Sequence, residues 1–235
     1  MNFPILSSLI LLPTVGAVFL LFTKSKKNNN ATVKYVALFT ALVNFFLSVY
    51  LWILFDQTTS QFQFVENRTW IEGFINYKVG IDGISILFII LTTFITPLCI
   101  ISVNNSIKNR LSEFLIAVLI MESFMIGVFC SLDLVVFYLF FEAGLIPMFL
   151  IIGIWGGTRR VYSAFKFFLF TLLGSVLMLV AIISIYWISG TTDVVQLYEL
   201  GIDVKYQNLL WLAFFSSFAV KTPMWPVHTW LPDAH

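Results

Sequence analysis

Seven long apolar runs fill most of the sequence and limit what the chain can fold into. A helix needs about 20 mostly apolar residues to cross the roughly 30 Å hydrocarbon core of a bilayer. Apolar residues make up 60% of the chain and charged residues only 11%, which excludes a water-soluble globular fold. The sequence therefore predicts an all-α integral membrane protein with about seven transmembrane helices. The expected spans are Phe3–Phe22, Val36–Leu54, Ile84–Val103, Ser112–Cys130, Leu134–Ile154, Ala164–Trp187 and Leu209–Trp225.

Charge and cysteine content exclude two further kinds of protein. Thirteen basic and twelve acidic residues give a net charge of +1, so the chain has no basic excess with which to bind nucleic acid. The two cysteines, Cys99 and Cys130, cannot supply the four thiolates of an all-cysteine zinc or iron–sulfur site. The expected surroundings are the lipid bilayer and other membrane proteins.

Basic residues are unevenly divided among the links between the runs. The first, third and fifth links hold or adjoin Lys24, Lys26, Lys27, Lys34, Lys108, Arg110, Arg159, Arg160 and Lys166. The intervening links hold Arg68, Lys78 and Lys205. Because cytoplasmic loops carry the excess of Lys and Arg, this pattern places the N-terminus outside.

The second link, residues 56–83, is then an external loop. Its short alternating segments Gln61–Val65 and Asn76–Ile81 predict a small β-hairpin. With no other division in its pattern, the chain is expected to form a single membrane domain over residues 1–235.

Three ionisable residues, Glu122, Glu142 and Lys221, fall deep within the expected spans. Each costs about 2.5–3.5 kcal/mol at a helix centre on the insertion scale, so each needs a partner or a purpose. Glu122 can be a protonated carboxyl that bonds to a neighbouring helix. Glu142 and Lys221 can form a static buried ion pair, but intramembrane ionisable residues more often mark ion or proton pathways.

Prolines interrupt the helical hydrogen bonding beside two of these charges. Pro147 lies five residues after Glu142, within the fifth run. Two prolines interrupt the seventh run, and Pro223 is expected to free the carbonyl of Ala219, close to Lys221. Broken backbone at membrane depth is tolerated where it is buried in protein or lines a wet cavity, as in the ion sites of transporters. The seventh helix is therefore predicted to be discontinuous.

The charges at the ends of the runs have a structural interpretation. Asp82 and Asp133 stand where helices are expected to start, so each is predicted to cap free backbone N–H groups. Lys166 stands near the inner end of the sixth run, and its long side chain is expected to reach the interface.

Three stretches, Val79–Ser85, Phe140–Gly156 and Phe218–His235, together resemble the antiporter-like membrane subunits of respiratory complex I. The stretch from Phe140 is most similar to the chain 4 type of these subunits. The resemblance implies that Glu142 and Lys221 take part in proton translocation, with His228 as a further member of the relay. Glu122 is a further candidate for the same role, because it is a carboxyl group deep in a span.

The resemblance also implies what lies outside this chain. No flavin, iron–sulfur cluster or haem is expected here, and NADH, flavin, iron–sulfur clusters and ubiquinone are expected in or on other subunits. The family's fold contains two inverted repeats, and the sequence covers only its N-terminal half. Expected partners are therefore the sister antiporter-like chains and, if the subunit is naturally split, the polypeptide with the C-terminal half. A truncated sequence is the other explanation.

The expected function is that of a proton-translocating membrane subunit of NADH:ubiquinone oxidoreductase, with no redox chemistry in the chain itself. Its 26 phenylalanines favour a mitochondrial inner membrane, and a bacterial plasma membrane is the alternative. A stand-alone cation/proton antiporter subunit is the second hypothesis. A seven-helix receptor is the third, although such receptors usually need an external disulfide, and Cys99 and Cys130 lie in or at the end of spans.

Overall fold

The computed structural model describes residues 4–23, 30–71, 75–103, 107 and 109–234. Within this part the chain forms helices and one small two-stranded sheet. It divides into two compact units, unit 1 (residues 1–67 and 78–131) and unit 2 (residues 68–77 and 132–235). The expectation of a single membrane domain stays a prediction. Lys24, Lys26, Lys27 and Lys108, on which part of the orientation argument depends, lie outside the described residues, so the external N-terminus also stays a prediction.

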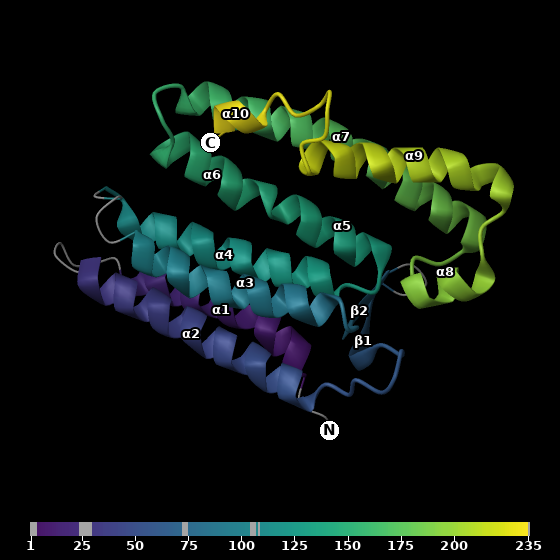
Figure 1. Ribbon diagram of the computed structural model, residues 1–235, viewed down its shortest axis with the longest axis horizontal. Helices are drawn as coiled ribbons and strands as arrows, with labels where there is room; N and C mark the ends of the chain where they lie inside the picture. The colour runs from purple at the N-terminus through teal and green to yellow at the C-terminus, as the bar shows by residue number, and fades with distance from the viewer. Residues whose placement is uncertain (1–3, 24–29, 72–74, 104–106, 108, 235) are drawn as a thin grey trace. The chain divides into compact units, whose positions relative to one another are not determined.

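Unit 1 is a bundle of four apolar helices (Figure 1). These helices are α1 (Ile5–Thr23), α2 (Asn30–Leu54), α3 (Ser85–Ser102) and α4 (Leu111–Cys130). Helix α1 packs against α2 and α4, and α3 packs against α2 and α4. A Cβ atom at Gly16 of α1 would overlap the side chain of Thr40 on α2, so glycine is what allows these two helices to approach so closely.

Unit 2 is built around one long helix. Its helices are α5 (Leu134–Ala143), α6 (Leu145–Trp155), α7 (Arg160–Ser189), α8 (Val194–Leu200), α9 (Val204–Lys221) and α10 (Leu231–Ala234). Helix α7 packs against α5, α6, α9 and α10 (Figure 1). Glu142 on α5 and Lys221 on α9 therefore both belong to helices that pack against α7. His228 belongs to the segment that follows α9.

Six helical segments of the described residues are long and apolar enough to cross a membrane. They correspond to the first six expected spans, and the fifth consists of α5 and α6 together, Leu134–Trp155. The prediction of an all-α membrane fold is confirmed. The seventh expected span corresponds to α9, which begins with several polar residues and is not among the six.

The strands β1 (Gln63–Ile71) and β2 (Ile75–Ile81) pair as neighbours in one sheet. They stand in the second link, where alternating residues predict a hairpin, but β1 starts two residues later and runs further than expected. Residues 72–74, between the strands, lie outside the described part.

Both expected aspartate caps are present. Asp82 Oδ1 accepts hydrogen bonds from the Ser85 and Ile84 N–H groups at 2.7 and 3.2 Å. Burial opposes the ionisation of Asp82, but these bonds and that of the Ser85 hydroxyl outweigh burial and lower the pKa of this carboxyl. Asp133 caps α5 through Val135 N–H at 2.9 Å. The capping prediction is therefore confirmed for both residues.

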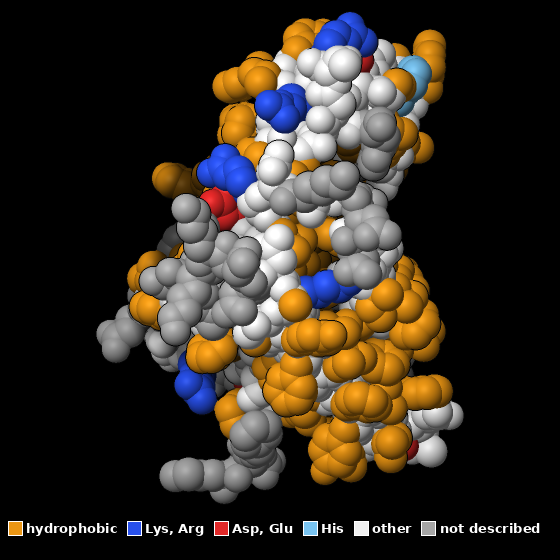
Figure 2. Space-filling view, turned by 90° about the vertical axis from the view of Figure 1, so that its left-hand side faces the viewer, with side chains coloured by type: hydrophobic (Ala, Val, Ile, Leu, Met, Phe, Trp, Pro, Cys, Tyr) orange, Lys and Arg blue, Asp and Glu red, His pale blue; other side chains and the backbone are white. Residues whose placement is uncertain are grey.

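The outer surface of the helices is apolar. On the face drawn in Figure 2, large apolar side chains form continuous patches, with Lys and Arg side chains at separate positions. Phe39, Phe46 and Leu173 are among the exposed apolar residues. Apolar side chains gathered on the outer surface in this way suit helices that face lipid.

Candidate proton-relay site

Glu142 lies at an interruption between two helices. Helix α5 ends at Ala143, Gly144 forms a turn, and α6 begins at Leu145. The Gly144 N–H still donates to the Phe140 carbonyl, at 3.2 Å. Gly144 keeps right-handed helical backbone angles, so the interruption is local. Pro147 stands in the first turn of α6 and has no N–H to donate to the Ala143 carbonyl, which agrees with the disturbed hydrogen bonding expected from the sequence.

Lys221 is the last residue of α9, so the structure confirms that the seventh helix is discontinuous. Residues 222–230 form turns that lead to α10. The carbonyl of Ala219 was expected to be free, but it accepts the Met224 N–H at 2.8 Å, which corrects that expectation. The indole of Trp230 donates to the Val220 carbonyl at 2.9 Å. The backbone before Lys221 is therefore held by groups from beyond the break.

Glu142 and Lys221 are close enough to interact through their charges. No N–O distance of 4.0 Å or less joins them among the ion pairs of the described residues. Instead the Lys221 Nζ lies 4.3 Å from the centre of the Phe141 ring. A direct static ion pair, one of the two alternatives from the sequence, is therefore absent from this conformation, and a cation–π contact is present in its place.

Ser175 of α7 lies beside Glu142 and also interacts with Tyr138, one turn earlier on α5. Its hydroxyl donates to the Leu172 carbonyl at 2.9 Å. Glu142 Oε1 is buried and has no hydrogen-bond partner among the described residues. This oxygen is free to accept a proton or a hydrogen bond, as a relay carboxyl must be.

The packing of α7 on α9 depends on a glycine next to Ser175. A Cβ at Gly174 would lie 3.0 Å from both Cβ and Cγ2 of Val220, the residue before Lys221. A methyl group at position 174 would require Val220 to give way by a few tenths of an ångström. Gly174 therefore helps to set how closely Lys221 approaches α7.

His228 lies in the turns between α9 and α10. Its Nδ1 atom is buried and has no partner among the described residues. Its carbonyl accepts the Leu231 N–H at 3.0 Å. The structure thus keeps His228 in the segment that follows Lys221, without a hydrogen bond from its ring to either relay residue within the described part.

Glu122 belongs to unit 1, where it is 2% exposed. Its Oε1 accepts a hydrogen bond from Asn44 Nδ2 of α2 at 2.9 Å. Its Oε2 is buried and has no hydrogen-bond partner within the part of the chain that the structure describes. Glu122 thus sits in an uninterrupted helix and bonds to a neutral amide.

Two basic side chains near the start of α7 meet Asp233 of α10. Lys166 Nζ bonds to Asp233 Oδ2 of α10 at 2.6 Å, and the expectation that this side chain reaches the interface stays a prediction. Arg159 reaches the other oxygen of Asp233 at 3.2 Å. Among the described residues, no three His, Cys, Asp or Glu side chains are grouped as a metal site.

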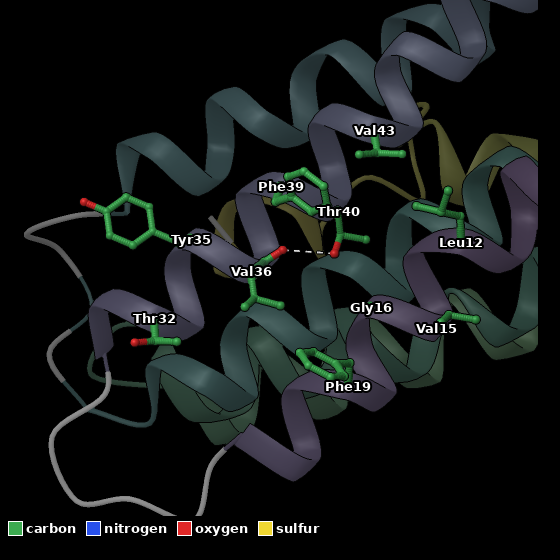
Figure 3. A pocket seen from close by; sticks show the side chains of 10 residues that line it. All are labelled: Leu12, Val15, Gly16, Phe19, Thr32, Tyr35, Val36, Phe39, Thr40 and Val43. Carbon is green, nitrogen blue, oxygen red and sulfur yellow. Dashed lines mark hydrogen bonds between the residues drawn. The ribbon is translucent and has the colours of Figure 1, made fainter.

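One groove in unit 1 has a volume of about 590 Å³ and lies between α1 and α2 (Figure 3). Gly16 and Thr40 are among its lining residues, and the Thr40 hydroxyl donates to the Val36 carbonyl at 2.9 Å. The lining is mostly apolar and includes neither Glu122 nor any other carboxyl group. The groove has no carboxyl, imidazole or amine in its lining, so the candidate chemistry remains with the buried ionisable residues.

The segment that carries Glu142 and Lys221 is similar to known proteins. A family model described as NADH:quinone oxidoreductase/Mrp antiporter, TM, matches residues 131–235, which include both. NADH-quinone oxidoreductase subunit M of Rhodobacter capsulatus is 53% identical over 98% of this chain and 48% of that protein. The chain is a homologue of these antiporter-like subunits. The resemblance inferred from the sequence is confirmed.

Two further proteins are similar to this chain over nearly its whole length. NADH-ubiquinone oxidoreductase chain 4 of Marchantia polymorpha is 49% identical over 98% of this chain and 46% of that protein. A chain of respiratory complex I from Thermus thermophilus superposes with a TM-score of 0.84 at 30% identity, over 98% of this chain and 46% of that one. The chain thus spans about half the length of the relatives it matches, and these matches replace the receptor hypothesis.

Four residues around Glu142 and Lys221 were not predicted from the sequence. They are Phe141, Gly174, Ser175 and Trp230. Small residues at positions 174 and 175 were a usable signal, because small side chains mark close helix packing in membranes. Phe141 and Trp230 gave no such signal in a chain with 26 phenylalanines and seven tryptophans.

Proposed function

We propose that this chain forms part of a proton-translocating membrane subunit of NADH:quinone oxidoreductase. The single observation that supports this most strongly is the position of Lys221, at the end of a broken helix and within charge interaction of Glu142. The homology over nearly the whole chain supports the same assignment. The complex then resides in an energy-transducing membrane, the mitochondrial inner membrane or a bacterial plasma membrane.

In the proposed relay, Glu142 and Lys221 exchange a proton. Transfer from the Lys221 ammonium to the Glu142 carboxylate leaves a neutral amine and a neutral carboxylic acid, and return of the proton restores both charges. Because the two groups are not locked in a direct ion pair, either can pass the proton to a further group. Phe141 stabilises the ammonium form in the conformation observed here.

His228 and Glu122 are further proposed members of the proton path. His228 supports this role by its buried, unpartnered Nδ1 in the segment after the break. The chain itself is proposed to carry no redox cofactor, so that NADH, flavin, iron–sulfur clusters and ubiquinone act on other subunits. Its proposed partners are the sister antiporter-like chains and the polypeptide that supplies the second half, if the subunit is split.

Replacing Lys221 tests the proposal in the assembled complex. Lys221→Ala should abolish most proton pumping in membrane vesicles while electron transfer from NADH to artificial acceptors stays near the parental rate. Lys205→Ala is the matched control, because Lys205 is an exposed lysine at the start of the same helix. Normal pumping by an assembled Lys221→Ala complex would contradict the proposal.

A stand-alone cation/proton antiporter subunit is the second candidate, because the description of the matching family model includes the Mrp antiporter. The two candidates differ in their partners. Purification of the native chain should bring flavin and iron–sulfur subunits with it if it belongs to the oxidoreductase. Purification of an intact assembly without them would favour the antiporter.

A further inference from the structure

Glu122 and Asn44 form a buried pair in unit 1 that joins α4 to α2. Asn44 is 0% exposed and Glu122 is 2% exposed. The Asn44 amide nitrogen donates to Glu122 Oε1 over 2.9 Å. The pair therefore has one hydrogen bond, made through one polar atom of each side chain.

The second polar atom of each side chain is left without a partner. Glu122 Oε2 and Asn44 Oδ1 are both buried and neither has a hydrogen-bond partner among the described residues. Both atoms are oxygens, and two oxygens cannot bond to each other without a hydrogen between them. Leaving two such acceptors unpaired in a membrane helix bundle is unfavourable.

One proton satisfies both oxygens. A protonated carboxyl and a primary amide are planar groups that each present a donor beside an acceptor, so they can pair through two parallel hydrogen bonds. We propose that Glu122 binds a proton on Oε2 and donates it to Asn44 Oδ1, so that the two side chains form a bidentate acid–amide pair. Asn44 is then the positioning residue of a proton-holding site separate from the Glu142–Lys221 pair.

Among the described residues of unit 1, the surroundings of the pair contain hydroxyl groups and no neighbouring cation. Thr14 pairs with Ser123 at 2.8 Å, and Ser48 pairs with Thr93 at 2.7 Å, so the adjacent hydroxyls already have partners. The other ionisable residues of α1 to α4 are Lys34, Tyr35, Tyr50, Cys99, Glu113 and Cys130. None of these contributes to the interactions of Glu122, which are burial and the bond from Asn44. A charged Glu122 would therefore lack a counter-ion within the described bundle.

Three variants of the assembled complex test the pairing by thermal stability. Glu122→Gln supplies an amide N–H in place of the proposed O–H, so the complex should keep nearly the parental midpoint temperature. Asn44→Leu removes both bonds and should lower the midpoint clearly. The double variant with leucine at both positions should recover part of that loss, because no polar group is then left unpaired. Ser48→Ala is the control for loss of one ordinary hydroxyl bond in the same helix.

Infrared spectroscopy of the same complexes measures the proton itself. Subtracting the Glu122→Gln spectrum from the parental spectrum should reveal a protonated-carboxyl band. Asn44→Leu should shift that band, because the carbonyl of the Glu122 carboxyl group then loses the hydrogen bond from the Asn44 amide. Two results would overturn the proposal. The first is a difference spectrum in which Glu122→Gln removes carboxylate bands and no protonated-carboxyl band. The second is a midpoint temperature that falls as far in Glu122→Gln as in Asn44→Leu. The test does not depend on proton pumping, so it stands apart from the proposed function.

Discussion

The two units each bury a glutamate within a membrane helix but surround it differently. Glu122 lies in the uninterrupted helix α4, almost fully buried, with a hydrogen bond from a neutral amide. Glu142 lies one residue before the end of α5, only partly buried, with one oxygen unpartnered and a lysine within charge interaction. From this difference we expect Glu122 to hold its proton more firmly than Glu142, which has to exchange one in the proposed relay.

The largest effect that would test this comparison is expected from neutralising Glu142. Glu142→Gln keeps the size of the side chain but cannot release or accept the relayed proton, so pumping should be almost lost while the complex still assembles. Glu142→Asp should keep part of the activity because it remains titratable. Assembly is measured on native gels and pumping in vesicles.

The matched change in unit 1 is Glu122→Gln, which should lower pumping less than Glu142→Gln does. Equal losses in both variants would show that the two carboxyls are not different in kind. An assembled Glu142→Gln complex that pumps fully would remove Glu142 from the relay.

The next effect is expected from the packing beside the relay. Gly174→Ala places a methyl group 3.0 Å from two atoms of Val220, and such overpacking typically costs about 1–3 kcal/mol. The thermal midpoint of the complex and the pumping rate should both fall. Gly153→Ala is the control, because its new methyl group would meet Ala164 at an ordinary 3.5 Å. Equal effects of the two changes would show that the close contact of α7 and α9 is unimportant.

A smaller effect is expected from the aromatic partner of Lys221. Phe141→Leu keeps apolar bulk but removes the ring face, and a cation–π contact of about 0.5–1 kcal/mol corresponds to a change of about two- to five-fold in pumping rate. Phe149→Leu is the control, because the Phe149 ring packs against the rings of Phe165 and Phe168 and has no cation–π contact among the described residues. A pumping rate for Phe141→Leu equal to that of the control would mean that the ring does not influence the relay.

The smallest effect is expected at Asp233. The hydrogen bond from Lys166, together with the charges of Lys166 and Arg159, holds the pKa of the Asp233 carboxyl below its ordinary value of 3.8. Because the pKa of Asp233 is lower in the folded state than in the unfolded state, ionised Asp233 stabilises the folded state at pH values above its ordinary pKa. This stabilisation is lost as the pH falls through the lowered pKa. Asp233→Asn should therefore cause a slight loss of thermal stability at neutral pH and none at strongly acidic pH.

Asp203→Asn is the control for Asp233→Asn, because asparagine caps a helix as well as aspartate does. A loss that persists at strongly acidic pH would show that the ion pair is not its cause.

Hydrophobic length alone predicted much of this fold. The expected span Ile84–Val103 is one residue longer at each end than α3, and Ser112–Cys130 differs from α4 by one residue. Pro147 indicated disturbed hydrogen bonding in the fifth run, but the turn at Gly144 itself was not predicted, because apolar residues continue through it and hydropathy does not report backbone hydrogen bonds. The first turn of α7 was missed because it begins with the charged Arg160.

Candidate site residues could be chosen from the sequence because a charge in an apolar span is conspicuous, as at Glu122, Glu142 and Lys221. Their partners could not be predicted in the same way. Asn44 lies 78 residues from Glu122, and an asparagine in an apolar run does not reveal which helix it faces. The sequence locates the costly groups, and the packing between helices determines what accompanies each of them.

The indole of Trp230 has a consequence for which changes the chain can tolerate. It reaches back ten residues to the Val220 carbonyl, so the intervening segment works as a spacer of fixed length. An exchange of one exposed side chain for another, for example at Trp225, leaves that length intact. Inserting or deleting a single residue there would move the indole off its carbonyl and release the end of the lysine helix. The count of residues in this segment is therefore under tighter constraint than the identity of most of them.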